Sequence, residues 1–215
     1  SKVNEKRLMD GKQPANFLLT KWAGKKPNLL SFEEKHGLRA CIIGSGLLMY
    51  GIAKLLGMDF IRYRNFEEGV ELALKSDYDF IHLHTKETDE AAHTKDPRNK
   101  VRVLEEIDSQ IGPLVESALR EEIFLVVTGD HTTPSCGPMI HSGEPLPIMF
   151  IGKNVRVDHV DSFGERNCAR GSIRMYGSDL MQMLLNYTDR AQFYNYRQGP
   201  RELNHIPKKI NKFRP

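Results

Sequence analysis

Four short apolar runs, separated by segments with helical spacing, constrain the fold of this chain more than any other feature. The runs lie at residues 40–43, 79–84, 123–128 and 146–151. They have the length and the β-branched and aromatic content of buried strands. The connections between them are long enough for crossover helices, which join parallel neighbours. We therefore predict an α/β fold with a largely parallel sheet flanked by helices, in which these four strands are neighbours.

The segments between the runs carry helix signals. Apolar residues recur at helical spacing over 47–56 and 66–75, and a further helix is expected over 178–187. The best-marked helix follows Asp96, which can act as its N-cap with Pro97 at the first helical position. The apolar stripe that should cover the sheet consists of Val103, Leu104, Ile107, Ile111, Leu114 and Val115.

Residues 1–35 form a leading segment before these patterns begin. It is basic and is interrupted repeatedly by glycine and proline, so we expect one short helical stretch near 17–22 and few core contacts. The main domain is expected over 36–215, ending in a basic tail.

Composition excludes several classes of protein. A formal charge of +3, 40% apolar residues and 27% charged residues fit a soluble globular protein without a broad nucleic-acid-binding surface. No run approaches the roughly 18 to 20 apolar residues that cross a bilayer, and the polar N-terminus lacks a signal-peptide pattern. Cys41, Cys136 and Cys168 are widely spaced, which argues against a disulfide framework. We expect a cytoplasmic protein with no nucleic-acid or membrane partner.

Candidate metal ligands follow two of the predicted strands. Asp89 and His93 come after the strand ending at residue 84 and would share one face of a helical turn. Asp130 and His131 come directly after the strand ending at residue 128, and His141 follows a short loop later. In open α/β sheets, ligands gather beyond the carboxyl ends of the strands. This set of oxygen and nitrogen donors suits Mn²⁺, Zn²⁺ or a similar divalent ion.

Two further features have structural interpretations. His82 and His84 alternate within a predicted strand, and we expect them to pack or to support the site. The run 44–46 precedes a helix but lacks the lysine and the spacing of a phosphate-binding loop, so we interpret it as a simple turn.

The motifs that contain these ligands resemble the archaeal-type 2,3-bisphosphoglycerate-independent phosphoglycerate mutases. They read HLHTKETDEAAH at 82–93, TGDHTTP at 128–134 and HSGEPLP at 141–147. The segments PANFLLTKWAG at 14–24 and SFEEKHG at 31–37 match the same family, so the resemblance covers nearly the whole chain. That family belongs to the alkaline phosphatase superfamily, which implies an alkaline-phosphatase-like sheet.

The resemblance implies a role for each ligand. Asp89, His93 and His141 match the three protein ligands of one metal ion, and Asp130 and His131 match two ligands of a second ion. Both ions would hold the phosphoryl group while a serine or threonine hydroxyl carries it between the two positions of the substrate. The implied reaction interconverts 3-phosphoglycerate and 2-phosphoglycerate, as in glycolysis and gluconeogenesis, without 2,3-bisphosphoglycerate.

Two lysines lie within the matching motifs. Lys21 and Lys86 are candidate contacts to the phosphate or carboxylate of the substrate, because a cation there suits an anion. Each could equally be a surface lysine.

Part of the family pattern has no match in this sequence. Family members begin with a metal-binding Asp, the nucleophilic hydroxyl and an inserted domain, and nothing before Asn16 matches these. The resemblance therefore implies an incomplete domain: residues 1–35 would follow a missing N-terminal half, and 36–215 would be the C-terminal part of the metal-binding phosphatase-like domain. No nucleophile can be assigned, and we expect the isolated chain to be inactive. Apolar surface exposed by the missing half would allow a homo-oligomer.

Two other functions remain open from the sequence. A two-metal set also serves hydrolysis, so a phosphatase or a phosphonate-cleaving relative is an alternative. The unassigned nucleophile leaves open a non-catalytic module that binds metal or phosphate.

Overall fold

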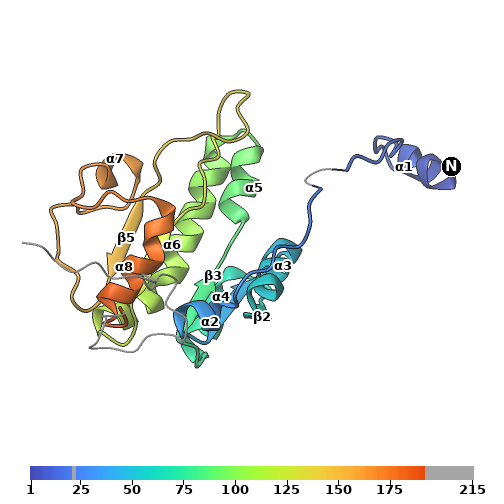
Figure 1. Cartoon of the computed structure of the whole chain (residues 1–215). Helices are drawn as coiled ribbons and strands as arrows, with labels where there is room; N and C mark the ends of the chain where they lie inside the picture. Colours follow the sequence, from blue (N-terminus) through green and yellow to red (C-terminus); the bar gives the residue numbers. More distant parts are fainter. Residues whose placement is uncertain (21–22, 192–215) are drawn as a thin grey trace, which may run out of the picture.

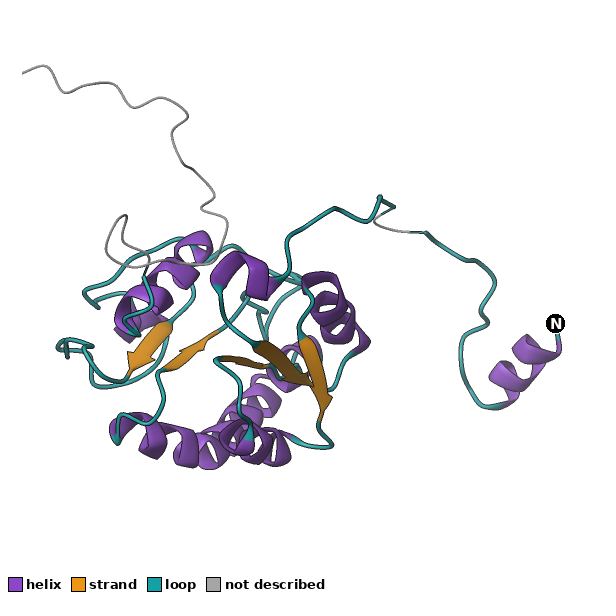
Figure 2. Ribbon diagram, turned by 60° about the horizontal axis from the view of Figure 1, so that its bottom comes forward, coloured by secondary structure: helices purple, strands orange, loops and turns teal. Residues whose placement is uncertain are grey.

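The fold has two small β-sheets with helices on both sides of the strands (Figure 1, Figure 2). The computed structural model describes residues 1–20 and 23–191. The larger sheet has the strand order β2-β1-β3, and both of its pairings are parallel. Its strands are β1 (Ala40–Gly44), β2 (Asp59–Arg62) and β3 (Phe80–Leu83). The predicted α/β class with a parallel sheet flanked by helices is confirmed.

The core is built on both faces of the central strand β1, all of whose residues are buried. Cys41 and Ile43 are fully buried and pack on one face with residues of α4 (Phe66–Lys75) and α6 (Pro97–Leu119). Ala40 and Ile42 pack on the other face against α3 (Leu47–Leu56) and α2 (Phe32–His36). A strand buried on both faces has no polar alternation, which explains its continuous apolar sequence.

The predicted helices over 47–56 and 66–75 are confirmed as α3 and α4. Helix α6 begins at Pro97, and the Asp96 side chain caps it by accepting a hydrogen bond from the backbone N–H of Arg98 at 3.0 Å. Its apolar stripe covers the sheet as predicted, except that Leu104 is exposed. The preceding short helix α5 (Glu87–His93) packs against α6 and carries Asp89.

The prediction that the strands at 123–128 and 146–151 join the parallel sheet is wrong. Strand β5 (Ile148–Ile151) pairs antiparallel with β4 (Leu125–Thr128), and among the described residues these two strands form a separate sheet. Residues 129–147 form no helix, so the chain lacks the crossover that parallel pairing requires. The chain instead doubles back, with the Ser142 N–H bonded to the Thr132 carbonyl at 3.1 Å. Strand β2 was not predicted, because only two of its four residues are apolar.

The leading segment differs from the sequence prediction. Residues 17–20 have no regular secondary structure, and residues 21–22 lie outside the described part of the chain. A helix, α1 (Lys2–Met9), forms instead near the N-terminus, where the Ser1 side chain accepts a hydrogen bond from the Asn4 N–H. None of its residues is buried, and Figure 1 shows it apart from the sheets.

The C-terminal part of the described chain packs beside the smaller sheet (Figure 1). It contains α7 (Glu165–Cys168), a 3-10 turn (Gly177–Asp179) and α8 (Leu180–Tyr187), which confirms the helix expected at 178–187. The Tyr187 ring stacks on Phe124 with centroids 5.5 Å apart. The predicted basic tail falls largely on residues 192–215, outside the described residues. Within the described ranges, no helix has both the length and the apolar character needed to cross a membrane.

Candidate metal centre

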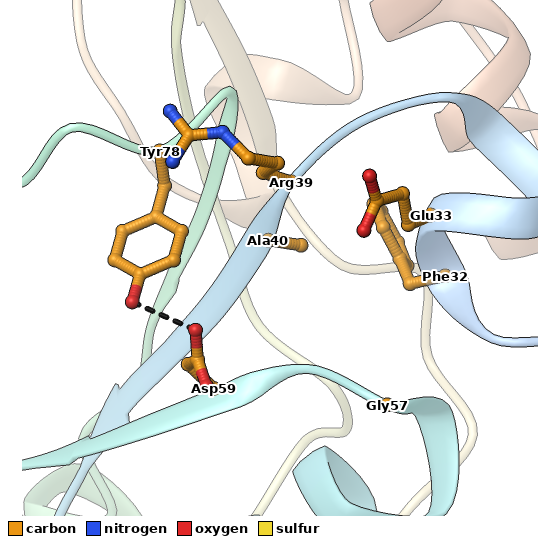
Figure 3. Close-up of a pocket in the computed structure, with 7 residues that line it drawn as sticks. All are labelled: Phe32, Glu33, Arg39, Ala40, Gly57, Asp59 and Tyr78. Atoms are coloured by element: carbon orange, nitrogen blue, oxygen red, sulfur yellow. Dashed lines mark hydrogen bonds between the residues drawn. The ribbon is translucent and has the colours of Figure 1, made fainter.

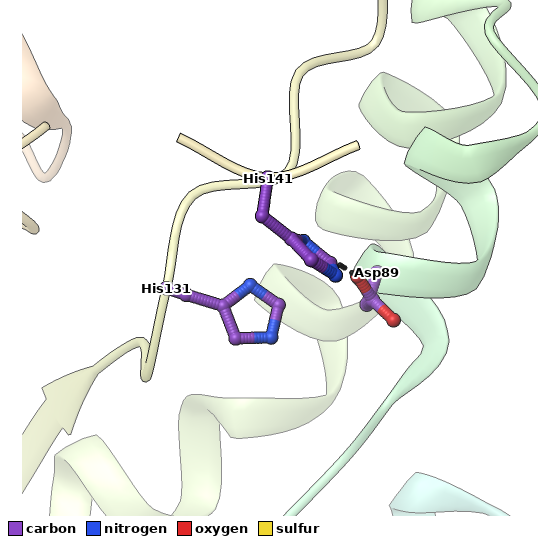
Figure 4. A group of neighbouring side chains, drawn as sticks. All are labelled: Asp89, His131 and His141. Atoms are coloured by element: carbon purple, nitrogen blue, oxygen red, sulfur yellow. Dashed lines mark ion pairs between the residues drawn. The ribbon is translucent and has the colours of Figure 1, made fainter. Parts of the chain in front are cut away.

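Three of the predicted ligands converge beyond the carboxyl ends of the strands. Asp89, on α5 after β3, lies beside His131 and His141 of the segment 129–147 that joins β4 to β5 (Figure 4). One ligand atom from each side chain lies within 4.8 Å of one from each of the others. The sequence predicted all three as ligands from their places after strand ends, and the fold brings them together as expected.

Asp89 is the most enclosed of the candidate ligands. Its side chain is 16% exposed, against 39% for His131 and 44% for His141. Burial alone would raise the pKa of Asp89, but the hydrogen bond from Thr133 and the charges of the neighbouring histidines outweigh it and lower the pKa. The carboxylate is therefore ionised at neutral pH, as a metal ligand requires.

His93 and Asp130 lie at the edge of this cluster. The Nε2 atom of His93 is 3.2 Å from Asp89 Oδ1, and its ring lies 5.2 Å from that of His141 between centroids. Asp130 is 75% exposed; its Oδ2 is 3.6 Å from His131 Nε2, and its Oδ1 accepts the His131 N–H at 2.9 Å. The structure thus groups His131 with Asp89 and His141. The division of the five residues between two ions stays a prediction.

Thr133 is a component of the cluster that the sequence interpretation missed. Its side chain is buried, with 3% exposure, and its hydroxyl donates to Asp89 Oδ1 at 2.7 Å. The same oxygen lies 3.2 Å from His131 Nδ1 and 3.1 Å from His141 Nδ1. Its position two residues after His131, within the quoted motif, was the signal available in the sequence.

Two lysines, also unassigned from the sequence, fasten the segment that carries His131 and His141. The Lys95 ammonium donates to the carbonyls of Pro134, at 2.8 Å, and Met139. The Lys100 ammonium donates to the Thr133 carbonyl at 2.9 Å. Lys95 has a φ of 59°, a left-handed conformation that is uncommon for a residue with a side chain. Lys95 directly follows Thr94, the C-cap residue of α5, and its N–H bonds to the Ala92 carbonyl at 3.0 Å, so the left-handed residue ends the helix.

His82 and His84 lie at the end of β3, on the side of the sheet edge where the ligands gather. Their rings stack with centroids 6.0 Å apart, and the Tyr63 hydroxyl donates to the His84 carbonyl at 2.8 Å. The surrounding protein lowers the pKa of each imidazole, chiefly by burial, while the charge of Asp130 acts in the opposite direction. Many protein atoms surround the His82 ring, which explains the lowered pKa, but the side chain still reaches solvent, so His82 is not a packing residue of the core. A supporting role for the pair stays a prediction.

The two predicted substrate lysines differ in what the structure describes. Lys86 occupies the N-cap position of α5, its ammonium 4.0 Å from Asp89 Oδ2, and its side chain is 64% exposed. It therefore lies at the rim of the cluster, where a mobile cation can reach an anion. Lys21 falls outside the described residues.

The residues present fit a divalent metal ion. Imidazole nitrogen and carboxylate oxygen are the donors that Mn²⁺ and Zn²⁺ accept, and the cluster combines an enclosed carboxylate with two imidazoles open to solvent on one side. A site of this kind leaves a coordination position for a further ligand. The arrangement can therefore hold an ion and present it to an anionic molecule.

A small cavity at the opposite, amino end of the sheet is not part of this centre (Figure 3). It has a volume of about 170 Å³ and is lined in part by Arg39, Asp59 and Tyr78. The Tyr78 hydroxyl donates to Asp59 at 2.9 Å, so these polar groups satisfy each other. The cavity shares no lining residue with the predicted ligands, and the metal cluster remains the candidate site.

A carboxylate and two imidazoles gathered beyond the carboxyl ends of β3 and β4 of an α/β fold are typical of a metal-dependent protein. The model of the Metalloenzyme superfamily matches residues 2–187, so the chain belongs to that family.

Its relatives include archaeal phosphoglycerate mutases, which confirms the predicted resemblance. The chain is 56% identical over 207 residues to a 2,3-bisphosphoglycerate-independent phosphoglycerate mutase 2 of Methanocaldococcus jannaschii, covering 96% of this chain and 48% of the relative. It is 37% identical over 202 residues to the 2,3-bisphosphoglycerate-independent phosphoglycerate mutase of Thermococcus kodakarensis, covering 88% and 49%. The chain spans about half the length of the curated relatives it matches.

Solved structures give the same result for the fold. A protein from Pyrococcus horikoshii has a TM-score of 0.79 at 33% identity, over 91% of this chain and 54% of that one. The cofactor-independent phosphoglycerate mutase from Thermoplasma acidophilum has a TM-score of 0.61 at 28% identity, over 86% and 46%.

Proposed function

We propose that the protein acts as a cofactor-independent phosphoglycerate mutase that interconverts 3-phosphoglycerate and 2-phosphoglycerate. The observation that carries this proposal is the convergence of Asp89, His131 and His141 within 4.8 Å at the carboxyl edge of the sheet. The names of the relatives support the choice of substrate, because they are phosphoglycerate mutases that match this chain over nearly its whole length. The proposal concerns a protein of the full length of these relatives, which are about twice as long as this chain.

The metal centre would be completed by the two peripheral ligands. Asp89, His131 and His141 would hold one ion of Mn²⁺, Zn²⁺ or a similar metal, with His93 close enough to Asp89 to join them. Asp130 would contribute to a second ion, giving two ions in the complete enzyme. Bound divalent ions neutralise charge on phosphoryl oxygens and favour ionisation of an attacking hydroxyl.

The chain's own residues would bind and orient the substrate. Lys86, exposed at the rim of the cluster, would turn from Asp89 to a phosphate or carboxylate oxygen, and Lys21 would make a second anionic contact. Residues 36–215 would act as the metal-binding part of a phosphatase-like domain, with 1–35 leading into it. The phosphoryl group would be carried on a serine or threonine hydroxyl to which we assign no residue of this chain.

The remaining features of the proposal follow from the family. The reaction would need no 2,3-bisphosphoglycerate and would take place in the cytoplasm, as a step of glycolysis and gluconeogenesis. A homo-oligomer is also part of this proposal, since Leu47 and Leu48 on α3 and Phe17 and Leu18 in the leading segment expose large apolar side chains.

A direct assay with 3-phosphoglycerate tests the proposal. We expect the protein at the full length of its relatives, loaded with Mn²⁺ or Zn²⁺, to produce 2-phosphoglycerate without release of inorganic phosphate. His141→Ala should abolish turnover, whereas His159→Ala, which changes an exposed histidine outside the cluster, should retain it. Release of phosphate in place of 2-phosphoglycerate would identify a phosphatase, and metal binding without either product would identify a binding module.

A further inference from the structure

We propose that Thr133 is a positioning residue that fixes the ring tautomers of His131 and His141, so that both present Nε2 to a metal ion. This inference rests on the proposed metal centre but concerns the protein's own hydrogen bonds. It assigns a role to a hydroxyl that belongs to none of the predicted ligands.

One oxygen atom, the Thr133 hydroxyl, contacts three candidate ligands. Thr133 Oγ1 lies 2.7 Å from Asp89 Oδ1, 3.2 Å from His131 Nδ1 and 3.1 Å from His141 Nδ1. All three partners are candidate ligands, and they come from two separate parts of the chain. The hydroxyl therefore lies at the centre of the cluster and touches each of the three converging side chains.

The number of hydrogens available decides the direction of each of these hydrogen bonds. A threonine hydroxyl has one hydrogen to donate and two lone pairs that accept. An ionised carboxylate only accepts, and its contact is the shortest of the three, so the hydrogen goes to Asp89. The two lone pairs must then accept from the histidines, which requires a hydrogen on Nδ1 of both rings. In a neutral imidazole, Nε2 is then the unprotonated nitrogen.

The burial of Thr133 keeps its hydroxyl in this arrangement. Thr133 is 3% exposed, so water does not compete for its lone pairs. Its carbonyl accepts a hydrogen bond from the Lys100 ammonium at 2.9 Å, which fixes the backbone at the same residue. Histidines that bind metals commonly use one ring nitrogen for a hydrogen bond that sets the tautomer and the other for the metal. One threonine here would perform that task for two histidines.

The tautomers can be observed directly by nitrogen-15 NMR of the imidazole rings. The measurement uses the 215-residue chain without metal, well above the ordinary imidazole pKa of about 6.5, with resonances assigned through His131→Gln and His141→Gln. We expect both rings to carry the hydrogen on Nδ1. On addition of Zn²⁺, the Nε2 resonances should move. Protonated Nε2 in the metal-free protein, or metal-induced shifts confined to Nδ1, would overturn the proposal.

Two variants separate the hydroxyl from a merely structural role. Thr133→Val keeps the shape and removes the hydroxyl, whereas Thr133→Ser keeps the hydroxyl and removes a methyl group. We expect Thr133→Val to lose the Nδ1–H signature and to bind Zn²⁺ roughly 10- to 100-fold more weakly, the usual effect of losing a group that orients a ligand. Thr133→Ser should restore both. Equal losses in the two variants, or wild-type affinity in Thr133→Val, would contradict the proposal.

The experiment distinguishes this inference from the proposed mutase activity. The tautomers of the metal-free wild-type protein test the role of Thr133 even if Thr133→Val does not fold. The conversion of 3-phosphoglycerate tests the reaction. Nδ1–H rings in this chain, together with no mutase activity in the full-length protein, would retain the inference and refute the proposed function. The reverse combination would do the opposite.

Discussion

The three-stranded sheet and the segment 129–147 are held by different kinds of interaction. In the sheet, β1 is buried on both faces, and its side chains pack against helices on each side. The segment 129–147 has no helix and contributes one buried residue, Thr133, to the described structure. It is placed by an isolated bridge, by two lysine ammonium groups and by the Thr133 hydroxyl.

This difference separates the stability of the fold from the geometry of the site. Apolar burial is non-directional, and its contribution is the sum of many contacts. Hydrogen bonds fix the orientation of the groups they join, and the loss of a single bond can release that orientation. Substitutions in the sheet should therefore reduce the free energy of unfolding, and substitutions in or beneath the segment 129–147 should chiefly disturb the ligands.

The largest effect is expected at the centre of the sheet. Ile43 is fully buried, and Ile43→Ala should lower the free energy of unfolding by about 2 to 5 kcal/mol through lost burial and an unfilled cavity. Urea unfolding followed by circular dichroism measures this. The matched control is Leu47→Ala on α3, where the side chain is 88% exposed and the change should stay within about 0.5 kcal/mol. Similar losses at both positions would show that burial does not organise this region.

The second prediction concerns the lysine that fastens the ligand segment. Lys95→Met removes the ammonium that donates to Pro134 and Met139, a loss of about 1.5 to 3 kcal/mol for hydrogen bonds from a charged group. Hydrogen exchange should accelerate in residues 129–147 while β1 stays protected. Lys153→Met, at an exposed lysine of the following loop, serves as the control. If exchange accelerated in β1 and not in the segment, the separation between the two regions would fail.

The third prediction concerns the hydrogen bonds that cap α2, a helix that packs against the three-stranded sheet. Helix α2 begins with a capping box, in which the Ser31 hydroxyl accepts from the Glu34 N–H and the Glu34 carboxylate accepts from the Ser31 N–H. Ser31→Ala should cost about 1 kcal/mol in thermal or urea unfolding. Glu33→Ala on the same helix lacks a capping role and should cost less. A null result for Ser31→Ala would mean that packing of Phe32 alone holds α2 in place.

The smallest effect on the free energy of unfolding is expected from protonation of Asp79 at low pH. The Arg39 N–H donates to Asp79 at 3.0 Å, and this bond, assisted by Arg190, lowers the pKa of Asp79 below its usual value. Because the folded pKa is lower than the unfolded one, the carboxylate stabilises the fold above about pH 4 and loses this contribution as the pH falls through the folded pKa. Asp79→Asn should flatten the acid side of the plot of unfolding free energy against pH. An unchanged acid slope would show that Asp79 makes no such contribution.

The sequence predicted the regions that burial organises. The continuous apolar run at 40–43 and the capped, striped helix after Asp96 follow from local patterns, and both are confirmed. Strand β2 was not predicted, because a four-residue edge strand is too short to show a hydropathy period. The predicted direction of β5 was wrong, because it depends on the path of residues 129–147. That path leaves no hydropathy pattern in the sequence.

The ligands of the candidate site could be predicted from the sequence, but the residues that position them could not. The places of Asp89, His131 and His141 after strand ends indicated that they would converge. Thr133 and Lys95 were not identified, because Asp89 is far in sequence from Thr133, as Pro134 and Met139 are from Lys95. A hydroxyl or an ammonium also has no distinctive spacing. The motif resemblance placed His131 with a second ion, whereas in the fold it lies with Asp89 and His141. This difference can be measured.

Calorimetric titration of the chain with Mn²⁺ or Zn²⁺ tests the centre most directly. We expect close to one ion to bind, as for a site with three protein ligands and an open position. His131→Ala and His141→Ala should weaken binding severely and to a similar degree, Asp130→Ala should weaken it less, and His159→Ala should leave it unchanged. If His131→Ala bound the ion as tightly as the wild-type chain, or if the wild-type chain bound none, the cluster of Asp89, His131 and His141 would not be the metal centre.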